Sequence, residues 1–191
     1  MTKGLILSIV GLGILTACDS PTPPSISAQD ALDAGAEFER IIDLPQTAAA
    51  DLPPGSAEFN GHAGGEVSGD ADGSVLGDMR MAIEFAGNTI SGEIDNINLI
   101  DEDDEPEQLL GGSLTIAGTE TDGILSATAS GELTAVGDES VRGSSIVSLT
   151  MSGNVLTDTA DGDTVAGQLS GSGDGDFYIN VFNGGFFGTS N

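Results

Sequence analysis

The chain of 191 residues has one cysteine, one histidine, one tyrosine and no tryptophan, and only four of its residues are basic. A single cysteine excludes an internal disulfide and any metal site built from cysteine pairs. The 31 acidic residues give a net charge of −27, which repels the phosphates of nucleic acids. His62 is the only histidine, and no nucleophile motif such as Gly-x-Ser-x-Gly lies near it. We therefore expect a protein that is not an enzyme, needs no cofactor and binds no nucleic acid.

Residues 1–17 have the layout of a secretory signal, with a positive charge at Lys3 and an apolar run over residues 5–15. This run is shorter than the roughly 18 to 20 residues that a membrane-spanning helix needs. The ending Leu15-Thr16-Ala17-Cys18 resembles the lipobox of bacterial lipoproteins, which implies that Cys18 is acylated and becomes the first residue of the mature chain. We expect its acyl chains to hold the protein in a membrane. The alternative is a short transmembrane anchor with an incidental cysteine.

The mature chain would contain 174 residues, a length that suits one domain. We divide it into a lipidated tether, residues 18–51, and a single domain, residues 52–191. Three arginines against 31 acids leave the mature chain with a net charge of −28. Such a field favours cations, basic protein surfaces or simple solubility in salt. We expect a monomer.

The tether begins with a proline-rich stretch and continues into a short helix. Residues 19–27 (DSPTPPSIS) contain three prolines and few side chains able to pack, which is typical of an extended spacer. Ser27 and Asp30 form a capping pair for a helix that should end before Pro45. Its apolar face would consist of Phe38, Ile41 and Ile42. We expect this helix to pack on the domain; the alternative is a plug or brace.

Beyond the tether, short alternating runs separated by Gly, Asp, Asn and Ser predict about eight β-strands. These runs cover residues 57–64, the two arms of 79–97, 109–118, 123–135, 144–155, 164–171 and 176–187. Links of hairpin length without intervening helices favour a small closed antiparallel barrel, because closure removes exposed sheet edges. The predicted fold class is therefore all-β, a single eight-stranded antiparallel barrel. A β-sandwich is the alternative.

The clearest hairpin is predicted to turn at the two residues Gly87-Asn88. In that register Ile83 faces Gly92. Met81 then faces Ile94, so that one face of both strands is apolar, as a one-residue slip would not allow.

Several segments of the domain resemble a known family. LPPGSAEFNG (52–61) is similar to the leading segment of the β-barrel domain of transferrin-binding protein B and related bacterial surface lipoproteins, and IEFAGNTISG (83–92) is similar to its hairpin signature. Residues 110–116 and 184–188 are weaker matches. The resemblance covers residues 52–191 and implies an eight-stranded, lipid-anchored barrel with aromatic residues in its interior. The family binds host proteins or nutrient carriers, but function depends on the site rather than the fold, so no particular ligand is implied.

Five adjacent acids, Asp101, Glu102, Asp103, Asp104 and Glu105, follow the predicted third strand. Because like charges repel, such a run is typical of a solvated loop. The alternatives are a loop that docks a basic partner or a weak Ca²⁺ site. Residues 158–163, with Asp174 and Asp176, have a Gly-Asp spacing similar to calcium-binding β-roll repeats but lack the regular period. We predict no metal site.

These observations predict a lipid-anchored cell-envelope protein that binds a protein partner or a small solute through the loops or the open end of its barrel. The alternative is a structural or protective envelope lipoprotein with an acidic surface and no tight ligand. The family resemblance favours the outer membrane, whereas Asp19, directly after the anchor, favours the inner membrane. A concave apolar pocket would support binding, and a barrel lumen filled by its own side chains would support the structural role.

Replacing the anchor residue tests the predicted lipidation. We expect Cys18→Ser to be released from the membrane or to stall as an uncleaved precursor, because serine offers no thiol to acylate. Membrane fractionation and the mass of the purified chain measure both effects. Normal cleavage and membrane retention of the variant would contradict the lipoprotein interpretation.

Overall fold

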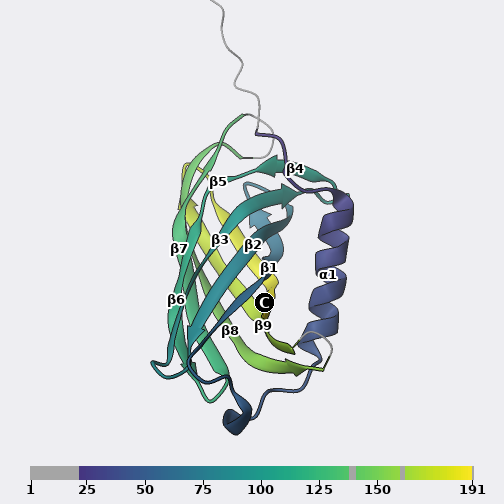
Figure 1. The fold of residues 1–191 in the computed structure, drawn as a ribbon. Coiled ribbons are helices and arrows are strands. Elements are labelled where there is room, and N and C mark those ends of the chain that lie inside the picture. Colours follow the sequence, from purple (N-terminus) through teal and green to yellow (C-terminus); the bar gives the residue numbers. More distant parts are fainter. Residues whose placement is uncertain (1–21, 138–140, 160–161, 191) are drawn as a thin grey trace, which may run out of the picture.

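The computed structural model describes residues 22–137, 141–159 and 162–190, so the predicted signal, Cys18 and Asp19 lie outside the described residues. Eight long strands form a barrel with one helix along its outer side (Figure 1). The strands are β1 (Ser56–Gly69), β2 (Gly73–Glu84), β3 (Thr89–Ile100), β6 (Leu114–Thr121), β7 (Ile124–Ala135), β8 (Gly143–Asp158), β9 (Gly162–Gly175) and β10 (Ile179–Ser190). The remaining elements are α1 (Ala28–Ile42), the 3-10 helix η1 (Ala49–Asp51) and the short strands β4 (Pro106–Leu109) and β5 (Gly111–Gly112).

The barrel is closed by pairing between its first and last strands. Each long strand pairs antiparallel with the next long strand along the chain, and β1 pairs with both β2 and β10. The result is an eight-stranded up-and-down barrel. The all-β barrel prediction is confirmed, and the β-sandwich alternative is wrong.

The predicted single strand over residues 109–118 is wrong in detail, because this stretch contributes to three strands. Leu109 ends β4, which pairs with β3, whereas the two-residue β5 pairs with β7. Gly112 has a φ of +94°, a conformation that interrupts an extended run and that glycine adopts without strain. A new strand, β6, then begins at Leu114.

The predicted two-residue turn at Gly87-Asn88 is also wrong. Glu84 pairs with Thr89, which leaves a four-residue loop, and Met81 faces Gly92 instead of Ile94. The Phe85 N–H donates to the Gly55 carbonyl over 2.8 Å, so Phe85 leaves the ladder with β3. Since the register moves by two residues, side chains keep their faces, and the apolar face that was predicted survives the error.

Alternate residues of the long strands fill the barrel lumen. Fully buried members include Phe59, Met79, Ile83, Ile116, Met151 and Phe186. Other lumen residues, among them Ile94, Leu114 and Ile179, line a cavity of about 30 Å³, which is room for about one water molecule. Phe187 follows Phe186 and therefore points outward, where it packs with α1 residues. The implied interior position of the aromatics thus holds for Phe59 and Phe186 but not for Phe187.

Helix α1 confirms the predicted capping pair and the predicted end before Pro45. Ser27 and Asp30 form a capping box, in which the Asp30 carboxylate accepts from the Ser27 N–H over 2.8 Å. The helix packs on the outside of the barrel through Ala34, Phe38 and Ile41. Ile42 is 39% exposed, so its assignment to the apolar face is wrong. Ile42 lies about 80° around the helix axis from Ala34, at the margin of the face that packs on the barrel.

The barrel core should depend strongly on Phe59. We expect Phe59→Ala to lower the free energy of unfolding by about 3 to 5 kcal/mol, because the change leaves a cavity where a fully buried ring packed. The neighbouring Glu58 is exposed, and Glu58→Ala should change stability by less than about 0.5 kcal/mol. Urea denaturation measures both values. Equal effects of the two variants would contradict the inward orientation of Phe59.

Candidate functional site

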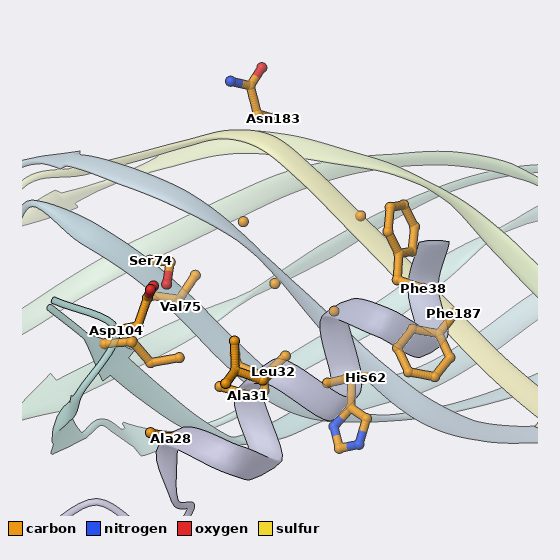
Figure 2. Close-up of a pocket in the computed structure, with 17 residues that line it drawn as sticks. Ala28, Ala31, Leu32, Phe38, His62, Ser74, Val75, Asp104, Asn183 and Phe187 are labelled. Carbon is orange, nitrogen blue, oxygen red and sulfur yellow. The ribbon is translucent and has the colours of Figure 1, made fainter. Parts of the chain in front are cut away.

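A hollow of about 250 Å³ lies between α1 and the outer wall of the barrel (Figure 2). We call it the helix groove. Its helix side is formed by Ala28, Ala31, Leu32, Ala34, Gly35 and Phe38. Its wall side is formed mainly by β1, β2 and β10 and includes His62, Gly64, Gly65, Val75, Leu76, Gly185 and Phe187. Most of these side chains are small or apolar, so the groove suits an apolar ligand rather than a highly polar one.

Small residues on both sides explain why the groove is open. The first half of α1 presents alanine and glycine to the barrel, and the wall below it carries glycines. Larger side chains dock the second half, where Phe38 and Ile41 pack in a cluster with Phe187. Phe38 lies directly over Gly185, where a Cβ atom would approach the ring to 2.4 Å. The helix is therefore held closely at one half and leaves space under the other.

The C-terminal end of α1 is tied to β8. Arg40 donates to the buried carboxylate of Asp158 over 2.5 Å and to Glu37 over 2.6 Å. These contacts raise the pKa of Arg40 above its usual value, and the hydrogen bond from Arg40 lowers the pKa of Glu37. Just beyond the helix, the Thr47 N–H donates to the Val155 carbonyl over 2.9 Å. Both the helix and the chain after it are thus fixed to the same strand.

The N-terminal approach to α1 is tied to the opposite end of the barrel wall. The Ser25 N–H donates to Asn98 Oδ1 over 2.9 Å, and the Leu109 N–H donates to the Thr22 carbonyl over 3.0 Å. The predicted spacer over residues 19–27 therefore lies against the barrel at Thr22 and Ser25 and does not separate these residues from it. Asn98 is fully buried, and a buried amide needs hydrogen-bond partners, which Ser25 supplies.

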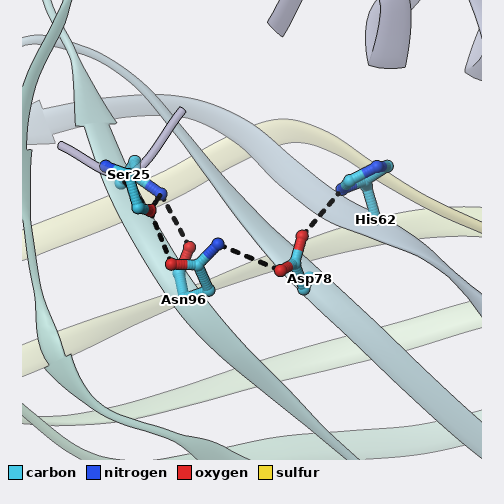
Figure 3. Close-up of polar contacts among 5 residues, drawn as sticks. Ser25, His62, Asp78 and Asn96 are labelled. Carbon is cyan, nitrogen blue, oxygen red and sulfur yellow. Dashed lines mark hydrogen bonds and ion pairs between the residues drawn. The ribbon is translucent and has the colours of Figure 1, made fainter. Parts of the chain in front are cut away.

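A line of polar contacts runs from this segment across three strands (Figure 3). Ser25 Oγ lies 2.5 Å from Asn96 Oδ1, and Asn96 Nδ2 donates to Asp78 over 3.0 Å. Asp78 Oδ1 lies 3.3 Å from His62 Nδ1. Asn96 has a φ of +51° at an irregularity in the β2–β3 pairing. This local backbone irregularity accompanies the polar contacts that join Ser25, β3, β2 and β1.

His62 is about one-third exposed and lies at the groove, with its ring centroid 5.6 Å from that of Phe187. Its Nδ1 makes no hydrogen bond, so its contact with Asp78 becomes an ion pair only when the imidazole is protonated. The serine in the polar line contacts Asn96 rather than His62. The arrangement therefore differs from a catalytic triad, in which the imidazole takes the proton of the hydroxyl.

The acidic loop Asp101–Glu105 lies at one end of the helix groove. Asp101 Oδ1 accepts from the N–H groups of Asp103 and Glu105, each over 2.9 Å, so this carboxylate shapes the loop. Asp104 lines the groove itself, close to Ser74 (Figure 2). Among the described residues, no three acidic, histidine or cysteine side chains are grouped so that they could hold a metal ion.

The acidic residues of the second region, Asp158 and Asp176, do not form one cluster. Asp158 contacts Arg40, whereas Asp176 accepts from the Ser144 N–H over 3.0 Å.

The residues that line the helix groove were not predicted as a site from the sequence. The sequence signal for them was the density of alanine and glycine in residues 28–36 and the pair Gly64-Gly65. Nothing in that composition shows which wall the helix would cover.

Comparisons of the chain with protein-family models, with curated proteins and with solved structures gave no match. The barrel is consistent with a lipocalin-like or transferrin-binding protein B-like fold, and no match names a family. No helix within the described parts of the chain is long and apolar enough to cross a membrane.

The contact between Phe38 and Gly185 can be tested by substitution. We expect Gly185→Ala to destabilise the protein by about 1 to 3 kcal/mol, because its Cβ would overlap the Phe38 ring. In a Phe38→Ala background the same change should cost much less, since the clashing ring is gone. A double-mutant cycle in urea measures the difference. Additive effects would show that α1 does not pack on Gly185.

Acid should loosen α1 before it affects the barrel. The hydrogen bond from the Ser27 N–H lowers the pKa of Asp30, and the hydrogen bond from Arg40 lowers that of Glu37. A carboxyl whose pKa is lower in the folded state contributes stability above its unfolded pKa, and this contribution is lost as the pH falls below about 4.

Hydrogen exchange at pH 6 and pH 3, corrected for the intrinsic exchange rate, measures this effect. Protection of α1 amides should fall more than that of β7 and β8 amides. The Asp30→Asn/Glu37→Gln variant serves as the control and should show a smaller pH dependence in α1. Equal loss of protection in helix and barrel would contradict the prediction.

Proposed function

We propose that the protein is a lipid-anchored cell-envelope protein that binds the apolar part of a small solute in the helix groove and catalyses no reaction. The observation that carries this proposal is the contrast between the two hollows. The cavity in the lumen has a volume of about 30 Å³, whereas the helix groove has a volume of about 250 Å³ and is lined by small and apolar side chains. A small solute would therefore bind between α1 and the outer wall rather than inside the lumen.

The attachment of α1 supports a preformed site. Ser25 contacts β3 on one side of the groove, and Arg40 and Thr47 contact β8 on the other. A helix fixed at both ends loses little freedom when a ligand enters beneath it, which favours binding. Ala28 and Ala31 can then contact a ligand without a large rearrangement.

The predicted anchor would hold the groove near a membrane. Four residue steps separate Cys18 from Thr22, and an extended chain covers at most about 14 Å in that distance. Thr22 is hydrogen-bonded to Leu109 at the β4 end of the barrel (Figure 1). Acylation of Cys18 would therefore hold this end, with the acidic loop and the start of α1, close to the lipid surface. On the family resemblance we propose the outer membrane, with the inner membrane as the alternative that Asp19 favours.

A structural or protective role is the second candidate, and the filled lumen favours it. In that case the acidic surface would serve solubility, and the groove would be a consequence of the small residues that let α1 dock. The two candidates differ in whether the groove binds anything.

The test uses an uncharged apolar fluorophore, N-phenyl-1-naphthylamine, and the unacylated Cys18→Ser protein produced without residues 1–17, so that neither the apolar signal nor a detergent competes. We expect saturable fluorescence enhancement that Ala31→Trp abolishes, because the indole would fill the groove. Ala36→Trp is the matched control, since Ala36 is exposed and does not line the groove. Circular dichroism would verify that both variants fold. Absence of binding, or equal binding by both variants, would favour the structural role.

A further inference from the structure

The helix groove continues into a second, open hollow that is strongly acidic. The second hollow measures about 420 Å³ and shares Ser74 and Asp104 with the groove. Its acidic members are Glu66, Asp72, Asp101, Glu102 and Asp104. We call it the acidic hollow. An apolar space and a negatively charged space are thus joined through the same two residues.

The groove has a different chemistry at each end (Figure 2). Phe38, His62 and Phe187 lie at one end, and Asp104 lies beside Ser74 and Val75 at the other. A ligand that extended along the groove would have its apolar part between α1 and the glycines of the wall. Its other end would then reach the carboxylates of the acidic hollow.

Among the described residues that line the groove or the acidic hollow, none is lysine or arginine. His62 lines the groove at the end away from Asp104 (Figure 2). Arg40 contacts Glu37 and Asp158 at the far end of α1. Arg80 lies on the outer face of β2, where Glu93 and Asp95 surround its guanidinium. The negative potential of the acidic hollow is therefore available to a ligand.

We propose that the solute is an amphiphilic cation, with a single hydrocarbon chain or ring in the helix groove and an ammonium or guanidinium group over the acidic hollow. The proposal rests on the proposed function and specifies its ligand class. Apolar surface drives the chain into the groove, and the carboxylates select the sign of the head group. Amphiphiles with a carboxylate or phosphate head are disfavoured, because like charges placed together are repelled.

The size of the groove limits the apolar part. A volume of about 250 Å³ lies just below the range of about 300 to 1,000 Å³ that is usual for drug-sized ligands. One hydrocarbon chain or one small aromatic group fits this space, whereas a steroid-sized body or a pair of long acyl chains would not.

Three eight-carbon probes that differ only in their head group test the proposal: octylammonium, octanol and octanoate. Calorimetry on the unacylated Cys18→Ser protein at low salt should show octylammonium binding at least about tenfold more tightly than octanoate, with octanol between them. The differences in affinity among the three probes should become smaller at high salt, because salt screens the interaction of the head group with exposed carboxylates.

A charge-matched pair of variants separates the acidic hollow from the charge of the whole protein. Asp104→Asn/Glu102→Gln should reduce the preference for octylammonium over octanol about three- to tenfold, as expected for two exposed charges. Asparagine tolerates the φ of +63° at position 104. Glu58→Gln/Glu132→Gln removes the same charge from exposed sites that line neither hollow and should leave the preference intact.

Each other outcome contradicts a definite part of the argument. Equal affinity for the three probes, with loss of binding in Ala31→Trp, would overturn the cation proposal and leave the proposed function standing. Equal loss of preference in the two charge variants would show that net charge alone acts. Binding of a basic amphipathic peptide without binding of octylammonium would assign the surface to a protein partner. Absence of binding by all probes would overturn the proposed function as well.

Discussion

The hydrogen-bonded pairing of β1 with β10 is the interaction on which the rest of the structure depends. It joins residues more than a hundred positions apart and turns a meander of strands into a closed wall. Closure gives every long strand one face toward the lumen and one toward the outside. The inward faces leave a cavity of only about 30 Å³ in the lumen, which is why the proposed binding site lies on the outer surface.

The outer surface near β1 and β10 is hollowed because several of its residues are glycines, which carry no side chain. Gly64, Gly65 and Gly185 carry no side chains, so α1 can cross the wall with Phe38 over Gly185. The first half of the helix faces the same bare wall with alanines, and space remains. The groove thus forms because α1 and the wall both carry small residues where they face each other. Contacts to β3 and β8 hold the helix in position. The acidic loop after β3 then supplies charge at one end of that space.

Local signals predicted the elements well and their junctions poorly. Alternation located every long strand, and the Ser27–Asp30 capping box located the start of α1. The turn after β2 was misplaced because the Phe85 N–H bonds to Gly55, a contact no local pattern shows. The split of residues 109–118 depended on partners in β3 and β7. Lipidation at Cys18, the membrane and the absence of catalysis stay predictions.

The sequence by itself determined the all-β alternation, the helix cap, the strongly negative charge and the lone cysteine that predicts an anchor. These follow from residue types and short-range spacing, and they hold whatever the strands pair with. Only the tertiary structure decided that Phe187 faces α1, that Thr22 and Ser25 bind the wall, and that Asp104 lies where the helix groove meets the acidic hollow. The physical reason is that barrel closure and helix docking bring together residues that are far apart along the chain. Local sequence patterns give no signal for such contacts.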